Sequence, residues 1–302
     1  MLRTRILSAV TIVAALVVVM YVDQGLAPWF PLWFFVSALV MAAAARELVD
    51  LLSSGHVRPD PRVVGGGLLA ILTAHWLPHL VAACPTHERF SAIMSEPSWS
   101  IGVFAWPFFS FTAVVMAAFV VESLRFERPG GAVDSIAATI LVVAYVGMLG
   151  GFMVQMRWLE GCKHGLIPLA MLIATAKGAD VGAYAIGRLF GRRKLWPSLS
   201  PNKTVAGGVG GLMFATLATL IVEWVAQDRG LVALGWIGAT AFGLTVGLTA
   251  QVGDLMESLM KRDRGRKDAS ATIPGFGGVL DVVDSLLFAA PVAYGFWAVL
   301  GP

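Results

Sequence analysis

The hydrophobic residues of this 302-residue chain fall into nine long runs separated by short polar segments. A helix needs about 20 apolar residues to cross the ~30 Å hydrocarbon core of a bilayer. The runs lie near residues 6–22, 30–46, 63–83, 99–121, 132–153, 165–187, 205–226, 231–253 and 281–300. The pattern therefore predicts an all-α, polytopic integral membrane protein with about nine transmembrane helices.

The composition supports lipid as the solvent for most of the chain. Hydrophobic residues make up 57% of it and charged residues 14%, against about 25% charged residues in a typical soluble domain. The net charge of +3 could suggest nucleic-acid binding. The Lys and Arg residues lie between the apolar runs, however, as expected of residues that orient a membrane protein. We therefore expect membrane lipids, and no nucleic acid, among its partners.

The distribution of positive charge predicts the orientation. With the N-terminus in the cytoplasm, 17 Lys and Arg residues fall in inside segments and four in outside connections. Inside loops are typically the basic ones, so we expect nine spans, a cytoplasmic N-terminus and an external C-terminus in a bacterial inner membrane. The run that ends near Val22 is long for a cleaved signal and leads to Pro28, so we interpret it as the first membrane helix.

The two cysteines, Cys84 and Cys162, then lie near the outer face. An oxidising compartment there would permit a disulfide between them. The alternative is a pair of unbonded cysteines that act as small hydrophobic residues.

The polar residues suggest two regions of the chain. Residues 1–130 carry little beyond hydropathy, so we expect transmembrane helices that act as a scaffold. Residues 131–302 carry charges within and beside the spans, so we expect the catalytic region there, with cytoplasmic loops at 188–204 and 259–280.

The sixth span contains ionisable residues. Lys177, Asp180, Tyr184 and Gly187 are spaced so that they share one helical stripe. A charge at the centre of a membrane helix costs about 2.5 to 3.5 kcal/mol on insertion scales and usually has a function. The stripe could line a substrate cavity, or Lys177 and Asp180 could merely pin two helices together.

The following polar loop combines a basic run with the turn Ser200-Pro-Asn-Lys203-Thr204 and a Gly-rich helix start. Exposed backbone N–H groups beside Lys and hydroxyl side chains suit a phosphate, although the spacing is not that of a P-loop. For the basic run 192–194, anchoring on the cytoplasmic side is an equally good explanation.

Residues 251–285 contain the strongest signal. Asp254, Ser258 and Lys261 share a helical face at the end of the eighth span, and Asp281 and Asp284 begin the ninth. Carboxylates that gather in this way repel one another unless cations bridge them, and Mg²⁺ prefers such oxygen ligands. Alternatively, the two aspartates could favour a helix N-terminus, and the basic run between them could bind anionic lipid.

The stretch SLMKRDRGRKDASATIPGFGGVLDVVDS resembles the signature of the phosphatidate cytidylyltransferases, also called CDP-diacylglycerol synthases. The matching positions are Ser258, Lys261, Arg262, Lys267, Asp268, Pro274, Gly277, Gly278, Asp281 and Asp284. The family's usual His and Arg are replaced by Phe276 and Val282. If those positions are catalytic, the protein would be slower or use another substrate; if they only shape the loop, nothing is lost.

The resemblance implies a reaction between CTP and phosphatidate that gives CDP-diacylglycerol and pyrophosphate. It implies Mg²⁺, with a possible second cation, held by Asp254, Asp281 and Asp284, and these three with Lys261 as the catalytic residues. The expected substrate-binding residues are Lys177, Asp180, Tyr184, Ser200, Lys203, Thr204, Ser258, Arg262, Lys267, Asp268, Gly277 and Gly278. A second copy of the chain is a possible partner.

Two other classes of function remain open. A related enzyme could transfer a nucleotide to another lipid phosphate, or could be a lipid kinase. A cation-coupled transporter would also place carboxylates and Gly-broken helices in a membrane. A transporter needs charges near the bilayer midplane, whereas most of these lie at predicted cytoplasmic helix ends.

Overall fold

The computed structural model of the chain describes residues 2–27, 29–53, 57–82, 102–127, 129–159, 165–231, 234–270, 272–273 and 277–301. It describes only the backbone of residues 2–10, 12–13, 81–82 and 102–103. The predictions for Cys84, Cys162, Pro274 and Phe276 concern residues outside these ranges.

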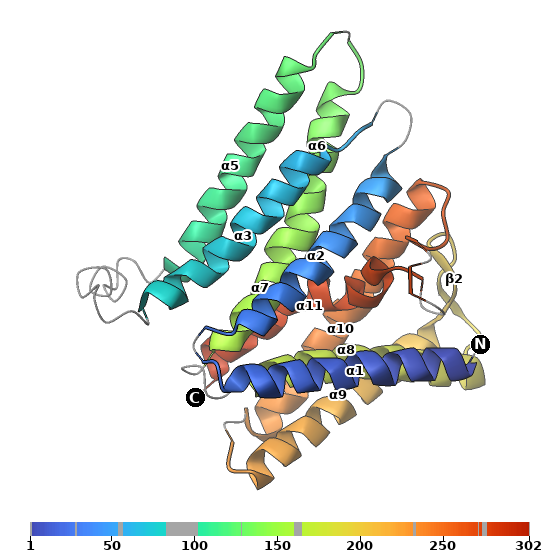
Figure 1. Cartoon of the computed structure of the whole chain (residues 1–302). Coiled ribbons are helices and arrows are strands. Elements are labelled where there is room, and N and C mark those ends of the chain that lie inside the picture. The colour runs from blue at the N-terminus through green and yellow to red at the C-terminus, as the bar shows by residue number, and fades with distance from the viewer. Residues whose placement is uncertain are drawn as a thin grey trace. The chain divides into compact units, whose positions relative to one another are not determined.

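Helices dominate the chain (Figure 1), which forms two compact units. Unit 1 contains Met1–Val154 and Asp268–Leu280, and unit 2 contains Gln155–Lys267 and Asp281–Pro302. The unit boundary therefore differs from the predicted division at residue 130. The loop after the eighth predicted span packs with unit 1, although it lies far along the chain from the rest of that unit. The functional division at residue 130 stays a prediction.

Unit 1 is built mainly from helices. Its helices are α1 (Leu2–Gln24), α2 (Pro31–Leu52), α3 (Pro61–Ala82), α5 (Gly102–Leu124), α6 (Ala132–Val142), the π-helix η2 (Val143–Met148) and most of α7 (Leu149–Gln155). Helices α3 and α5 pack side by side (Figure 1). A short β-bridge joins Ile273 and Gly277 in the loop that precedes α11.

Two buried aspartates determine where helices of unit 1 begin. The Asp23 carboxylate accepts hydrogen bonds from the backbone N–H groups of Leu32 and Trp33, both at 3.0 Å, in the first turn of α2. Asp60 accepts from Arg62 at 2.7 Å and Val63 at 2.9 Å at the start of α3. Each carboxylate satisfies donors that have no partner within the helix.

Unit 2 contains the 3-10 turn η3 (Met156–Trp158), α8 (Leu166–Phe190), α9 (Val205–Asp228), α10 (Gly235–Asp263) and most of α11 (Val279–Leu300). A small antiparallel hairpin, β1 (Lys194–Trp196) and β2 (Ser200–Thr204), connects α8 to α9. The Glu223 carboxylate near the end of α9 accepts from the Leu234 and Gly235 N–H groups, at 3.0 and 2.6 Å, and so caps the start of α10.

Helices α8 and α9 approach closely because glycines line their contact. A Cβ added to Gly182 would lie 2.5 Å from the Gly210 carbonyl oxygen, and one added to Gly210 would lie 2.4 Å from Cβ of Ile186. Close backbone approach through small residues is a common way for membrane helices to associate. A buried hydrogen bond of 2.6 Å between Thr175 and Thr219 also joins the pair.

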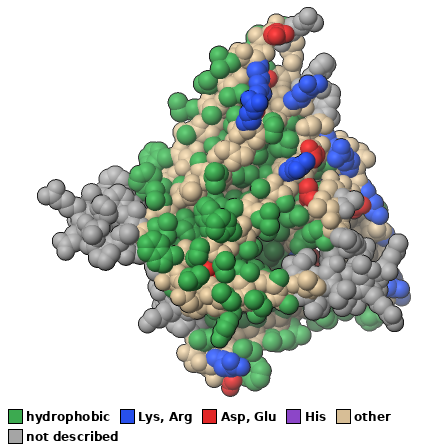
Figure 2. Space-filling model, viewed as in Figure 1, with side chains coloured by type: hydrophobic (Ala, Val, Ile, Leu, Met, Phe, Trp, Pro, Cys, Tyr) green, Lys and Arg blue, Asp and Glu red, His purple; other side chains and the backbone are tan. Residues whose placement is uncertain are grey.

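Each of the nine predicted spans overlaps a helical segment of the described residues. Seven of them, Pro31–Leu52, Pro61–Leu80, Phe104–Leu124, Ala132–Trp158, Leu166–Phe190, Val205–Asp228 and Val279–Leu300, are long and apolar enough to cross a membrane. The protein is therefore an all-α, polytopic integral membrane protein, and the total of nine stays a prediction. Hydrophobic side chains cover much of the face in Figure 2, as expected of surfaces that contact lipid.

The glycine contact predicts a contrast between two neighbouring substitutions on α9. Gly210→Ala should lower the free energy of unfolding by about 1–3 kcal/mol because its Cβ collides with Ile186. Gly208→Ala is the matched control: its Cβ would lie 3.5 Å from Gln251, an ordinary contact. Thermal unfolding of both variants in detergent should give a lower midpoint for Gly210→Ala alone. Equal midpoints would contradict this account of the contact.

Candidate active site

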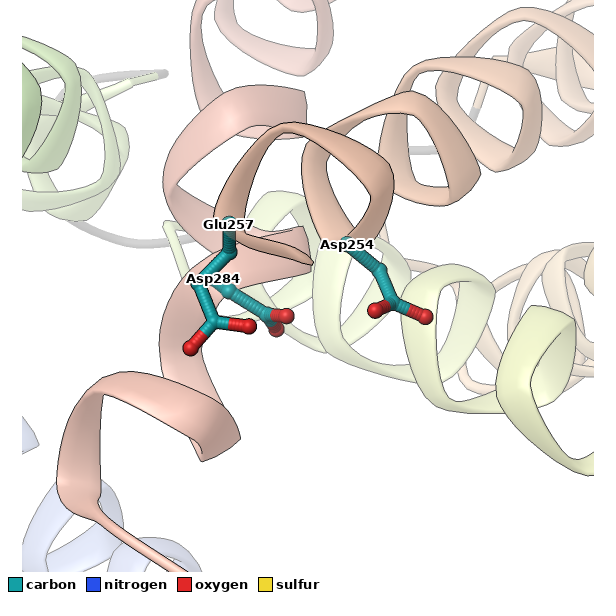
Figure 3. Close-up of side chains that lie close together, drawn as sticks. All are labelled: Asp254, Glu257 and Asp284. Atoms are coloured by element: carbon teal, nitrogen blue, oxygen red, sulfur yellow. The ribbon is translucent and has the colours of Figure 1, made fainter. Parts of the chain in front are cut away.

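Three carboxylates meet in unit 2. Asp254 and Glu257 come from α10 and Asp284 from α11, and one oxygen of each lies within 4.8 Å of the others. Figure 3 shows the three side chains directed toward a common region. Glu257 is fully buried and Asp284 is 5% exposed, whereas the side chain of Asp254 is 35% exposed. One edge of this acidic cluster is therefore accessible to a ligand.

The local sequence explains why these side chains meet. Asp254 and Glu257 are three residues apart on α10, so they share a helical face. Gly253 permits the close approach of α11: a Cβ there would lie 2.6 Å from Cβ of Phe288 and 3.1 Å from the Asp284 carbonyl oxygen. The absent side chain thus allows the backbone that bears Asp284 to lie beside the two acids of α10.

Burial and repulsion disfavour negative charge at the inner end of the cluster. Glu257 lies beyond the predicted span 231–253, where burial, followed by the charge of Asp284, raises its pKa to about 9. The ammonium of Lys261 opposes this shift. A bound cation would favour the ionised carboxylates instead. The cluster therefore has the oxygen donors that suit a hard divalent cation, and binding of the cation would favour their negative charge.

Two lysines contact the acids. The Lys203 ammonium lies 2.7 Å from the Asp254 carboxylate. Lys261 lies between Glu257 and Asp281, with 2.7 Å to Asp281. The structure thus brings the predicted residues Lys203, Lys261, Asp254 and Asp281 into paired contacts. Asp281 pairs with Lys261 and is not one of the three clustered carboxylates, and its role as a metal ligand stays a prediction.

The predicted stripe of α8 belongs to the same unit. Lys177 lies 3.2 Å from Asp180 and donates a hydrogen bond of 3.0 Å to the Val282 carbonyl oxygen on α11. Asp180 also interacts electrostatically with Asp254 and Lys203. Tyr184 is exposed and accepts a hydrogen bond from Arg188 at 2.9 Å. Lys177 therefore links α8 to α11 in addition to pairing with Asp180.

The hairpin residues have clear structural roles. The Thr204 hydroxyl accepts from the Gly207 N–H at 3.1 Å and caps α9. Ser200 pairs with Trp196 in the hairpin. Arg262 donates to the carbonyl oxygens of Leu199 at 3.2 Å and Arg266 at 3.1 Å. Each of these three residues therefore stabilises the local backbone. Their predicted contacts with substrate stay predictions.

The remaining predicted residues differ in their exposure to solvent. Ser258 is buried on α10, whereas Lys267 and Asp268 are exposed in the loop after it. Gly277 and Gly278 belong to unit 1, where Gly277 adopts a φ of 97°. Their predicted contacts with substrate stay predictions.

Glu257 was not among the residues predicted for the site, although its spacing from them indicates that it belongs there. Glu257 follows Asp254 by three residues and precedes Lys261 by four, so it lies on the same helical face as both. Among Asp180, Asp254, Glu257, Asp281 and Asp284 and their three lysines, Lys177, Lys203 and Lys261, acids outnumber lysines by five to three. This excess of carboxylates is what a cation would offset.

Named relatives resemble long stretches of the chain. Phosphatidate cytidylyltransferase of Synechocystis is 29% identical over 301 residues, which cover 89% of this chain and 90% of that protein. The Bacillus subtilis phosphatidate cytidylyltransferase is 36% identical over 53% of this chain and 58% of its own length. The Brucella suis enzyme is 40% identical over 45% of this chain and 48% of its own length. In the last two alignments, the chain spans about half the length of its relative.

A family model covers almost the entire chain. The model of the cytidylyltransferase family matches residues 3–300, which include the acidic cluster, both of its lysine partners and the helices of both units. This match confirms the resemblance predicted from the motif of residues 258–285, and the chain belongs to the cytidylyltransferase family.

Proposed function

We propose that this protein transfers the cytidylyl group of CTP to phosphatidate, giving CDP-diacylglycerol and pyrophosphate. The observation that carries the proposal is the match of the cytidylyltransferase family over residues 3–300, which includes a partly buried acidic cluster with lysines beside it. The name of the Synechocystis relative, aligned over 90% of its length, supports phosphatidate as the acceptor. The product would supply phospholipid synthesis in the membrane.

We propose Mg²⁺ as the cofactor, held by Asp254, Glu257 and Asp284. Their carboxylate oxygens, within 4.8 Å of one another, form a donor set that suits this hard cation. When bound, Mg²⁺ would reduce the repulsion between the phosphates and the acids and stabilise negative charge as the reaction proceeds. Asp281 lies one turn before Asp284 on α11 and could join this set.

The chain's own residues would mainly bind and orient two polyanions. The phosphate of phosphatidate is a monoester with a second pKa of about 6, so at neutral pH it is already an anionic nucleophile and needs no general base. Its oxygen would form a bond to the α-phosphorus of CTP while the bond to pyrophosphate breaks. Lys203 and Lys261, which contact the acids, would exchange part of that pairing for contacts with phosphate oxygens.

We further propose nine transmembrane helices and a cytoplasmic active site. The bias of 17 to 4 in Lys and Arg supports both. Helix α10 is 29 residues long, and its Gly, Thr and Gln residues lower its mean hydropathy relative to the seven more apolar helices. A cytoplasmic site would receive CTP from the cytosol and the lipid phosphate at the level of the headgroups.

The activity itself is the first test. Purified protein in mixed micelles should release pyrophosphate from CTP only when phosphatidate and Mg²⁺ are both present, and the lipid product should contain CMP. A lipid kinase would leave a nucleoside diphosphate instead of pyrophosphate, and a transporter would release neither. Release of pyrophosphate that does not depend on phosphatidate would contradict the proposed acceptor.

Charge removal within the cluster should abolish turnover. Asp284→Asn keeps the size of the side chain and removes one negative charge, so the rate should fall at least about a hundredfold, or about 2.7 kcal/mol. The control is Asp263→Asn on α10, which removes an equal charge from a side chain that is 68% exposed. Pyrophosphate release and Mn²⁺ binding, followed by electron paramagnetic resonance, should both be impaired in Asp284→Asn alone. Wild-type Mn²⁺ affinity in that variant would remove Asp284 from the proposed metal site.

Reporter fusions should test the orientation. A reporter inserted at Gly265, in the loop after α10, should be cytoplasmic, and one fused after Pro302 should be periplasmic, because α11 would separate them. The two reporters would lie on the same side if α11 did not cross the membrane, and that result would refute the nine-span arrangement.

A further inference from the structure

A buried carboxylate on α2 binds the loop that precedes α11. Glu47, which is 7% exposed, accepts hydrogen bonds from three donors more than 220 residues away in the chain. The Ser270 and Thr272 hydroxyls donate to its Oε1 at 2.6 and 2.9 Å. The backbone N–H of Leu280 donates to its Oε2 at 2.8 Å. All these residues belong to unit 1.

Gly278 lets the backbone of the loop close on this carboxylate. A Cβ at Gly278 would lie 2.3 Å from Oε2 of Glu47 and 2.8 Å from the Ser270 hydroxyl. The preceding Gly277 has a φ of 97°, a conformation that glycine adopts without strain. It also exchanges two backbone hydrogen bonds with Ile273, at 2.7 and 3.2 Å. The two glycines therefore let the chain turn and approach Glu47 directly.

The contact fixes the beginning of α11. Leu280 is the second residue of that helix, and its N–H is among the donors that have no acceptor within the helix. A negative charge at this end is also favourable for the helix dipole. Asp281 follows Leu280 directly, and Asp284 follows one turn later on the same helix. A shift or rotation of the helix start would therefore be transmitted through the backbone to both acids.

We propose that Glu47 is a positioning residue, which keeps the first turns of α11 ordered and so holds the helix backbone that carries Asp284. The proposal concerns the same site as the proposed function and extends its machinery to α2. Glu47 does not belong to the acidic cluster, and its carboxylate already accepts three hydrogen bonds from unit 1. It would act on the site only through the loop and the backbone of α11.

Hydrogen exchange in the full-length protein tests the first step. In Glu47→Gln, one carboxylate oxygen becomes an NH₂ group that cannot accept from the surrounding donors, so at least one of the three bonds is lost. Amides of residues 279–285 should exchange about tenfold faster, the factor that corresponds to a loss of about 1.4 kcal/mol. The exchange rates of amides in α9 should be unchanged. The matched control is Asp50→Asn, an exposed acid three residues later on α2.

Mn²⁺ affinity, measured without substrates, tests the second step. Glu47→Gln should weaken binding about tenfold, whereas Asp50→Asn should bind like the wild type. If Glu47→Gln does not fold, the double variant Ser270→Ala/Thr272→Val removes two of the donors and should give the same local pattern. Absence of CDP-lipid synthesis by the wild type would refute the proposed function, but it would leave these comparisons intact.

Three results would overturn the role of Glu47. One is unchanged exchange at residues 279–285 in a folded Glu47→Gln protein. Another is faster exchange in every helix together with a lower unfolding temperature, which would indicate that Glu47 stabilises the whole protein rather than the start of α11. The third is faster local exchange with wild-type Mn²⁺ affinity, because the start of α11 would then have no influence on Asp284.

Discussion

The arrangement of this protein depends on the compensation of charges that are withdrawn from water. Each acid near the site contacts a cation or a set of donors: Asp254 contacts Lys203, Glu257 and Asp281 share Lys261, and Asp180 contacts Lys177. Asp284 differs from these acids, because within the described part of the chain no Lys or Arg nitrogen lies within 4.0 Å of its carboxylate, which accepts a hydrogen bond from the Ser285 N–H at 2.5 Å. A buried carboxylate without a directly paired cation is costly, so an added cation would stabilise Asp284 more than its neighbours.

The same constraint explains the acids outside the cluster. Asp23, Asp60, Glu47 and Glu223 each accept hydrogen bonds from backbone N–H groups at or near the start of a helix. A helix start offers several unsatisfied donors and a partial positive charge, so it stabilises a carboxylate. Asp60 has an ion pair with Arg125 in addition. Some carboxylates of this membrane protein therefore orient helices, whereas the three acids of the cluster lie close to one another and have only two lysines in contact, Lys203 with Asp254 and Lys261 with Glu257. That difference separates structural acids from acids that are suited to bind a ligand.

The sequence predicted the parts of the fold that hydropathy and local spacing determine. Helices occur at all nine apolar runs, and the pairing of Lys177 with Asp180 follows from their spacing on α8. Glu257 was not predicted, although its spacing of four residues from Lys261 would have allowed it. The contact between Glu47 and Leu280 could not be predicted in this way, because it joins positions 233 residues apart. No local pattern shows which buried acid will meet which helix start, since that depends on how the helices pack.

Helix packing also determines which predicted residues can act together. Gly182 and Gly210 bring α8 and α9 into contact, and Gly253 brings α10 against α11. Lys177 then reaches the Val282 carbonyl oxygen on α11, while Lys203, just before α9, reaches Asp254 on α10. A Cβ at any of these glycines would collide with the facing helix. The glycines of unit 2 therefore contribute to the geometry of the site, because they allow charges from α8, α10, α11 and the hairpin strand β2 to interact.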